Sequence, residues 1–464
     1  MTTAAKQFKR QAAAITKDLR HRDLVETALT NYEASRDQKT GLFADWQGAR
    51  DAAAAIKTQA IARLDEHIER LVKHLEARGT KVHFAADGAE ACRIVKDIAA
   101  GHGVKAAVKS KSMTTEEIHL NDALAGAGVE VVESDLGEFI VQLRGEGPYH
   151  IVFPAMHLKR DEISRLFHDK LDSEETDSPE ELTMIARREL RRRFCRADMG
   201  ITGANFAVAE TGMVAITENE GNARLTAALP KVMVTLLGIE KVVGRMADLA
   251  LLWPMLASVG AGQLLSGYNT LYAGPRREGE SDGPEEFHVV LLDNRRTALL
   301  ADPELRDTLR CIRCGGCLNV CPIYRHVGGH TYGTTYSGPI GAVITPHLRG
   351  IAEFQHLSFA SSLCGACGEI CPVRIPLHRH MLTNRRRGAK VAGVWWQKLA
   401  FKMFNLVAGS RLLWKIITVG GRIGQVPHRL IAGSIIDPAR CWTKTRKAPR
   451  FAKQSFKTWW RKRA

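Results

Sequence analysis

The sequence predicts an α/β domain with a largely parallel sheet, followed by a helical module that is rich in cysteine. Between residues 78 and 295, short β-branched runs alternate with helical stretches, a pattern typical of parallel sheets whose strands are joined by helices. Seven of the ten cysteines then lie within residues 311–371. These changes of pattern divide the chain into a helical segment (1–77), an α/β domain (78–300), a cysteine module (301–384) and a basic region (385–464).

The predicted elements follow from local periodicity. The N-terminal segment is rich in alanine and charge, and its apolar residues recur at helical spacing, as at Ile61, Leu64, Ile68 and Leu71. The strands expected in the α/β domain are 81–85, 105–110, 129–134, 150–154, 213–218, 231–238 and 288–293. A polar loop at 275–286 precedes the last of them.

Charge is concentrated at the C-terminal end. The net charge is +16, yet residues 385–464 contain 20 Lys and Arg against one acid, Asp437, and the remainder is nearly balanced. Within this region, 399–424 is mostly apolar with a narrow basic stripe at Arg411, Lys415 and Arg422. Two interpretations stay open: a helix packed on the protein's own core or a partner, or a basic amphipathic helix on an anionic membrane surface.

The N-terminus has charges every few residues and no apolar core, so we expect no secretory signal. No run of 18 uncharged apolar residues occurs, so we expect no spanning helix. Together with the abundant thiols, these features predict a cytoplasmic protein, with peripheral contact at the inner face of the membrane as an option. Nucleic-acid binding by the basic region is a weaker alternative, because no recognised nucleic-acid motif accompanies it.

The cysteines form two runs that each end in Cys-Pro. The first has the spacing C-x2-C-x2-C-x3-C-P, which is typical of ferredoxins that hold cubane iron–sulfur clusters. A structural zinc site needs only two C-x-x-C pairs and does not explain the further cysteines. If the ligands cross between the runs, one cluster is held by Cys311, Cys314, Cys317 and Cys371, and the other by Cys321, Cys364 and Cys367.

The second cluster lacks a fourth cysteine. Ser361 stands where a complete second motif would have one. A three-iron cluster remains possible, as does a four-iron cluster with serine, water, substrate or a partner residue at the open iron. The separation of the two runs favours an all-helical ferredoxin module. Cys92, Cys195 and Cys441 are distant in sequence and are interpreted as ordinary thiols.

Three further segments are candidates for ligand binding. Residues 109–117 follow a predicted strand, and they suit either an anion site or a well-capped helix. The turns at 202–205 and 209–212, with the polar residues at 218–222, could line a pocket, although turn chemistry alone explains their Gly and Asn. Gly101-His-Gly103 precedes a strand and is therefore discounted as a dinucleotide motif. His119, His157 and His168 are expected on helices as surface or packing residues.

Several long motifs together resemble one family. VKSKSMTTEEIHLNDAL, ADMGITGANFAVAETGMVAITENEGNARL, CIRCGGCLNVCPIYRHVGGHTYGTTYSGPIGAVITP and SSLCGACGEICPVRIPLH occur in the order found in the lactate-utilisation iron–sulfur protein B family (LutB, also called LldF). The resemblance implies a LUD domain, which is a sugar-isomerase-like α/β fold, fused to a helical ferredoxin module with two clusters, expected to be [4Fe–4S]. It also implies the same seven cysteine ligands, without a cysteine at 361.

The family works with two sister subunits, LutA-like and LutC-like, in oxidising L-lactate to pyruvate. The resemblance therefore implies an electron-transfer component of an L-lactate dehydrogenase complex that allows growth on lactate. It assigns no catalytic residue, and whether this chain is itself an enzyme stays open. The alternatives are a catalytic LUD domain and a nucleic-acid-binding iron–sulfur protein.

Overall fold

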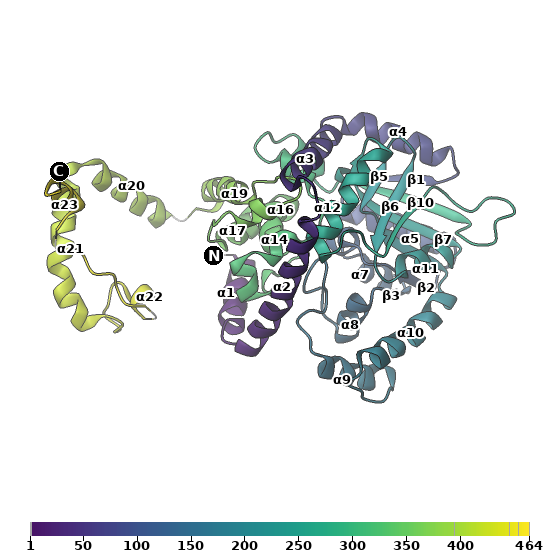
Figure 1. The fold of residues 1–464 in the computed structure, drawn as a ribbon, viewed down its shortest axis with the longest axis horizontal. Helices are drawn as coiled ribbons and strands as arrows, with labels where there is room; N and C mark the ends of the chain where they lie inside the picture. Colours follow the sequence, from purple (N-terminus) through teal and green to yellow (C-terminus); the bar gives the residue numbers. More distant parts are fainter. Residues whose placement is uncertain (1, 394, 445, 453, 464) are drawn as a thin grey trace. The chain divides into compact units, whose positions relative to one another are not determined.

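The computed structural model describes residues 2–393, 395–444, 446–452 and 454–463 (Figure 1). The chain forms two compact units, one up to residue 391 and one from residue 392 onward. The first unit contains the predicted α/β domain and the cysteine module. The second contains most of the basic region.

A six-stranded sheet organises the first unit, and all of its strands are parallel in the order β1-β10-β7-β4-β2-β3. The strands are β1 (Lys81–Ala85), β2 (Ala106–Lys109), β3 (Glu130–Glu133), β4 (Met199–Gly203), β7 (Val232–Gly238) and β10 (Glu286–Leu292). Every residue of β7 is buried, because both faces of a parallel sheet are covered, and such strands read as continuous apolar runs. The predicted α/β class is therefore confirmed.

Each face of this sheet packs against its own layer. Alternate residues of β7 point to opposite faces: Val234 and Leu236 pack with α5 and α7, whereas Met233 and Leu237 pack with α4 and α11. These helices are α4 (Leu64–Glu76), α5 (Gly88–Gly101), α7 (Leu120–Ala125) and α11 (Asn222–Ala228). At the β3 edge, Val108 and Val132 pack with α8 (Leu136–Arg144), α9 (Arg160–Leu171) and α10 (Pro179–Arg196).

A smaller sheet, with the strand order β8-β5-β6-β9, packs on the same face of the large sheet as α4 and α11. Its strands are β5 (Phe206–Val208), β6 (Met213–Glu218), β8 (Val242–Val243) and β9 (Tyr268–Tyr272). The strand predicted at 213–218 exists as β6, but it pairs antiparallel with β5 and β9 and belongs to this second sheet.

The strand predicted at 150–154 is absent, and this prediction was wrong. Residues 149–157 form bends and turns, and Phe153 is the one residue among them without an assigned conformation. His150 Nδ1 accepts hydrogen bonds from the backbone N–H groups of Val152 and Phe153, and Pro154 O accepts from Tyr149 N. A side chain that binds the backbone locally competes with the ladder of a strand, so this apolar run forms a compact turn.

The N-terminal segment forms four helices: α1 (Thr3–Ile15), α2 (Leu19–Thr40), α3 (Trp46–Ala62) and α4. The first three do not pack on the large sheet. Val25, Leu29 and Ala53 share one apolar core with the cysteine module and with α12 (Leu249–Ala261). Figure 1 shows α1 and α2 beside the green helices of that module.

The cysteine module is helical, as predicted. It contains α14 (Gly316–Asn319), α15 (Pro322–Val327), α16 (Gly338–Arg349), α17 (Ile351–Phe359), α18 (Ala366–Ile370) and α19 (Leu377–Ala392). Short 3-10 turns precede α14 and follow α15. A further helix, α13 (Arg296–Leu300), connects the last strand of the large sheet to this module.

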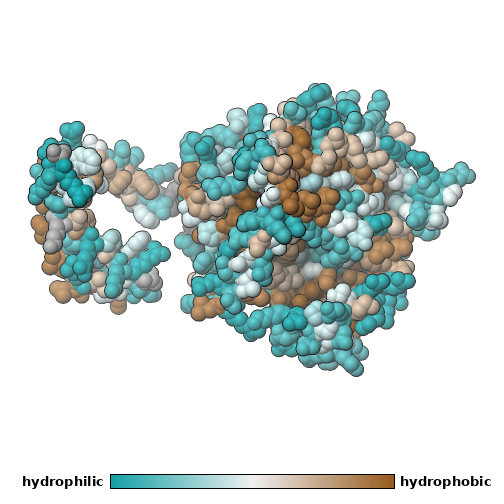
Figure 2. All heavy atoms as spheres, in the orientation of Figure 1, coloured by the Kyte–Doolittle hydropathy of each residue, from teal (hydrophilic) through white to brown (hydrophobic). Residues whose placement is uncertain are grey.

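The second unit consists of α20 (Trp395–Gly409), α21 (Arg411–Ile431), α22 (Arg440–Thr443) and α23 (Phe456–Arg461). The apolar stretch 399–424 is thus divided between two helices, because Ser410 caps α21 by accepting a hydrogen bond from Leu413 N. Neither α20 nor α21 buries any described residue, and Figure 2 shows apolar side chains on the surface of this unit. Among the described residues, no helix is long and apolar enough to span a membrane.

Candidate metal centre and the pocket beside it

The two cysteine runs repeat one local backbone. Arg313 and Leu363, each placed just before a C-x-x-C pair, have left-handed φ angles of 59° and 56°. The glycines that follow, Gly315 and Gly365, have φ angles of 78° and 90°. A short helix, α14 or α18, then carries the next cysteine. Left-handed residues at these positions turn successive N–H groups toward one concave side, an arrangement that suits anionic sulfur.

Four thiols from the two runs form one group. Burial raises the pKa of the Cys314 thiol, and Cys371 and Cys311 raise it further. Burial and Cys311 likewise raise the pKa of Cys371, to about 11. The pKa of Cys317 is raised by burial, Cys314 and Cys311. The four thiols therefore lie close enough to disfavour one another's ionisation, and we call Cys311, Cys314, Cys317 and Cys371 the first cysteine group.

The remaining three thiols form a second group. Burial raises the pKa of Cys367 to about 12, with additional contributions from Cys321 and Cys364. Burial and Cys364 raise the pKa of Cys321. Cys367 also acts on Cys317 of the first group, so the two groups are neighbours. We call Cys321, Cys364 and Cys367 the second cysteine group. The seven thiols predicted as ligands thus form two neighbouring groups, and their role as cluster ligands stays a prediction.

Ser361 occupies in the second run the place that Cys311 occupies in the first. The backbone N–H of Arg313 donates to Cys311 Sγ at 3.4 Å. In the same way, the backbone N–H of Leu363 donates to Ser361 Oγ at 3.1 Å. The serine oxygen therefore replaces a sulfur within an otherwise repeated backbone, and Ser361 lines a hollow together with the three thiols of the second group.

The chemistry of the donor set fits an iron–sulfur cluster in each group. Buried thiols with raised pKa values are protonated at neutral pH unless a cation stabilises the thiolate, and a metal cluster supplies that charge. Backbone N–H groups already point at sulfur, as from Ile375 to Cys371 at 3.4 Å, and such bonds tune clusters of this kind. In the first group, Cys314, Cys317 and Cys371 are buried and Cys311 is partly buried.

The two groups differ in what covers them. Arg50 of α3 reaches the first group and donates to Cys371 O from Nε at 3.0 Å and from Nη2 at 2.9 Å. Gly260 of α12 lies against Cys314, where a side chain would meet the Cys314 carbonyl oxygen. In the second group, Cys364 is exposed. The first group is therefore enclosed by distant parts of the chain, and the second reaches the surface.

A buried ion network ties the first run to the α/β domain. Arg313 Nη2 lies 3.2 Å from Glu240 Oε1, and Arg296 Nε lies 2.5 Å from Glu240 Oε2. Arg296 also pairs with Glu117, which accepts from Tyr336. Although burial alone would raise the pKa of Glu240, Arg296 and Arg313 hold it near 2. None of these residues was singled out for this role from the sequence, because the charges come from four separate segments.

A cavity of about 340 Å³ opens at the carboxyl edge of the large sheet, and we call it the sheet-edge pocket. Parallel sheets place their ligands at this edge. One wall comes from the segments after β2, β3, β4 and β7, and it includes Lys111, Asp135, Asn205 and Lys241. The opposite wall includes part of α12 together with Arg313 and Cys314. The pocket therefore borders the first cysteine group.

The candidate segments at 109–117, 202–205 and 218–222 all contribute to this pocket, as the polar residues there suggested. The turn at 209–212 does not line it. Lys241 and Arg313 were missed. Lys241 follows the strongly apolar run of β7, so its position after a strand was the available signal. Arg313 lies inside the cysteine motif, where nothing in the sequence shows that it faces a distant sheet.

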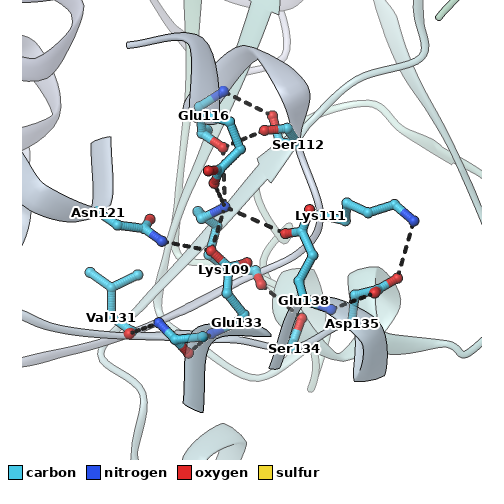
Figure 3. Close-up of polar contacts among 12 residues, drawn as sticks. Lys109, Lys111, Ser112, Glu116, Asn121, Val131, Glu133, Ser134, Asp135 and Glu138 are labelled. Carbon is cyan, nitrogen blue, oxygen red and sulfur yellow. Dashed lines mark hydrogen bonds and ion pairs between the residues drawn. The ribbon is translucent and has the colours of Figure 1, made fainter. Parts of the chain in front are cut away.

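Lys109, the last residue of β2, and Lys111, two residues later, have different surroundings (Figure 3). Lys109 is fully buried, and its Nζ lies 2.8 Å from Glu133 Oε1, 3.1 Å from Glu116 Oε1 and 4.0 Å from Glu138 Oε2. Although burial lowers the pKa of this ammonium, Glu133 and the other two carboxylates more than reverse that effect. Lys111 instead lies 3.4 Å from Asp135 Oδ2.

The segment 109–117 therefore does not act as a single anion site, because its residues face different surroundings. Lys109 is the internal cation of a glutamate cluster, and that cluster borders a second cavity of about 550 Å³. Ser112 caps α6 (Met113–Glu117) by accepting from Thr115 N, as the capped-helix alternative expected. Within this segment, Lys111, the two serines beside it and Met113 line the sheet-edge pocket.

The other predicted residues lie outside the two cysteine groups and the sheet-edge pocket. His119 has a left-handed φ of 55° and begins α7, and His168 lies on α9. His157 lies in a turn and not on a helix, where it stacks on Tyr149 and pairs with Glu146 at 3.0 Å. Cys92 is buried and Cys195 is exposed, both away from the cysteine groups. The side chain of Cys441 lies outside the described part. Gly103 forms a turn before β2, with a φ of 63°.

Two family models match parts of the first unit. The LUD domain model matches residues 68–292, and the 4Fe-4S dicluster domain model matches residues 307–375. A crystal structure of a DUF162 family protein from Deinococcus radiodurans covers 49% of this chain and 98% of its own, with 13% identity and a TM-score of 0.28.

Curated relatives match over nearly the whole chain. Lactate utilization protein B from Bacillus cereus (strain AH820) is 41% identical over 467 residues, covering 99% of this chain and 98% of the relative. The proteins of the same name from Bacillus thuringiensis (strain Al Hakam) and Bacillus anthracis (strain CDC 684 / NRRL 3495) match at the same identity and coverage. The chain belongs to the lactate utilization protein B family, as a LUD domain joined to a 4Fe-4S dicluster domain.

Proposed function

We propose that this protein is the iron–sulfur electron-transfer subunit of a cytoplasmic complex that oxidises L-lactate to pyruvate and so allows growth on lactate. In this proposal, the first cysteine group holds one [4Fe–4S] cluster with four thiolates, and the second holds another with three. The observation that carries it is the crossed grouping of the seven thiols, which come from two distant runs of sequence.

Clusters of this kind accept and release single electrons when bound. In this proposal the two sites lie side by side, which is supported by the effect of Cys367 on the pKa of Cys317. Arg50, α12 and the burial of the first group exclude water from it. Burial and N–H···S bonds are the means by which a protein tunes cluster potentials. Two adjacent sites suit the two electrons that lactate yields.

The exposed Cys364 gives the second site a distinct role in this proposal. Electron transfer to another protein needs a close approach, and a cluster at the surface allows it. The first site then receives electrons inside the chain, and the second passes them to a LutA-like or LutC-like sister subunit. The name of these relatives refers only to lactate utilization, so this assignment of partners is part of the proposal.

We further propose that the basic C-terminal unit makes peripheral contact with an acidic partner or with the inner face of the membrane. Trp395, Phe401 and Leu430 are 75%, 74% and 89% exposed, and the unit has a large excess of Lys and Arg. Exposed apolar residues with basic neighbours bind anionic surfaces. Full-length protein should sediment with vesicles that contain anionic lipid and not with zwitterionic vesicles. Equal recovery with both would leave an acidic protein partner as the alternative.

The electron-transfer role is tested by co-purifying the chain with its sister subunits without oxygen. Iron counting should give two clusters per chain, and adding L-lactate should produce the EPR signals of reduced clusters. D-lactate and heat-inactivated complex are the controls. Protein with two full clusters that L-lactate fails to reduce in the assembled complex would contradict the proposal, as would protein that binds zinc and no iron.

A further inference from the structure

The sheet-edge pocket is the place where the α/β domain meets the first cysteine group. Its volume of about 340 Å³ falls within the range of small-molecule sites. Polar residues at the ends of four parallel strands face apolar residues of α12 across it, and Cys314 forms part of the wall. A molecule bound here therefore lies beside the proposed first cluster.

The acidic residues of the pocket already have partners. Glu218 accepts from the backbone N–H groups of Ala223 and Arg224, at 2.6 and 2.9 Å. Asp135 pairs with Lys111 at 3.4 Å and also caps α8. Glu220 accepts from Leu136 N at 2.9 Å, and burial together with Asp135 raises its pKa to about 7. The Glu220 carboxyl group lines the pocket and can bind a hydroxyl group there.

One cation of the pocket has no such partner. Lys241 Nζ donates to the carbonyl oxygen of Ala204 at 2.5 Å, and within the described residues no carboxylate lies within 4.0 Å of it. The adjacent carboxylate of Glu240 is engaged by Arg296 and Arg313 instead. Burial lowers the pKa of Lys241 to about 8. This lysine is therefore mostly charged at neutral pH. Lys241 is partly buried, and a partly buried ammonium without a carboxylate favours an anion beside it.

We propose that the sheet-edge pocket binds a small carboxylate of the 2-hydroxy-acid or 2-oxo-acid type, with Lys241 as its counter-ion, against the wall formed by Arg313 and Cys314. The buried Arg313 Nε has no hydrogen-bond partner among the described residues and is a second donor on that wall. Asn205 and Glu220 are available for the hydroxyl or oxo group. This inference rests on the proposed function and specifies where its substrate or product contacts this subunit.

Equilibrium binding to the cluster-loaded full chain tests it, without the sister subunits. Calorimetry under anaerobic conditions compares L-lactate and pyruvate with lactamide, which keeps the shape of lactate but lacks the charge. We expect both acids to bind at least tenfold more tightly than lactamide. Pyruvate should also change the EPR spectrum of the first cluster in the reduced protein. Equal binding of lactate and lactamide, or no binding of either acid, would overturn the inference.

The Lys241→Gln variant separates this cation from the rest of the pocket. Affinity for both acids should fall at least tenfold, with unchanged iron content. The matched control is Lys231→Gln, whose side chain is 77% exposed and outside the pocket, and it should bind like the wild type. Unchanged affinity in Lys241→Gln would overturn the inference. If that variant loses its iron, the comparison of lactate with lactamide on wild-type protein decides alone.

These outcomes are distinguishable from failure of the proposed function. Clusters that L-lactate reduces in the assembled complex, in a chain that binds neither acid by itself, would leave electron transfer standing and remove the carboxylate site. Binding that depends on Lys241, with clusters that L-lactate never reduces, would do the reverse.

Discussion

The first and second cysteine groups share a local backbone and differ in everything around it. In both, left-handed residues and a short helix present the thiols in the same order. The first group has a fourth sulfur and is enclosed by α3 and α12. The second has Ser361 in the fourth place and an exposed Cys364. The motif therefore sets the shape of each site, whereas distant segments set its protection from solvent.

The largest expected effect comes from removing a ligand of the enclosed group. Cys314→Ser should lose the first cluster and about half of the iron, because a buried cluster needs all four thiolates. Iron analysis and EPR of anaerobic protein measure this. Cys195→Ser, which changes an exposed thiol outside both groups, should keep all of the iron. Full iron content in Cys314→Ser would show that this residue is not a ligand.

The next largest effect is expected at Arg50, through which the N-terminal helix α3 covers the first cysteine group. Arg50→Met should lower the free energy of unfolding by about 3 kcal/mol, because it leaves the buried Cys371 O and Gly368 O without their donor. Urea denaturation of the cluster-loaded protein measures the change. Arg374→Met is the control, since its pair with Asp51 is largely exposed and should cost less than about 1 kcal/mol. Equal losses in the two variants would remove the special role of α3.

A smaller difference should appear when iron is removed from the wild-type protein. A chelator should strip the second cluster several times faster than the first, because Cys364 is exposed and Cys314 is buried. EPR followed over time distinguishes the two sites. Simultaneous loss of both signals would mean that the enclosure by α3 and α12 does not protect the first site.

The smallest change restores the missing sulfur. Ser361→Cys should slow the loss of iron from the second cluster in air, because the backbone at 361 already has the geometry found at Cys311. Iron retention and EPR after oxygen exposure measure the effect. Ser281→Cys, at an exposed position outside this hollow, is the matched control and should behave like the wild type. No difference between the two variants would show that position 361 does not face the cluster.

Much of the fold could be predicted from the sequence, for identifiable reasons. Strands such as β7 and β10 are buried on both faces, so their apolar runs were visible. The run at 150–154 was equally apolar, but His150 binds the backbone of its own turn, and periodicity cannot show such a local hydrogen bond. The short strands β5 and β8 have only three and two residues, too few for any periodic signal.

In the candidate site, too, features set by local spacing could be predicted, whereas contacts between distant segments could not. The spacing of the seven cysteines indicated both groups, because ligands close in sequence can share one cluster face. The segment 109–117 suited either an anion site or a well-capped helix, yet Lys109 at its start pairs with Glu133 and its neighbours. Those glutamates come from β3 and α8, so their effect depends on packing that no local pattern records.

By itself, the sequence determined the α/β class and the helical cysteine module, since both depend on local spacing and burial pattern, and it predicted the two sets of thiols as ligands. Only the tertiary structure decided that the N-terminal helices enclose the first cysteine group, and that Cys314 borders a pocket at the edge of the sheet. Both arrangements join segments hundreds of residues apart. Such contacts arise from the burial of complementary apolar and charged surfaces, which acts across space and leaves no regular spacing along the chain.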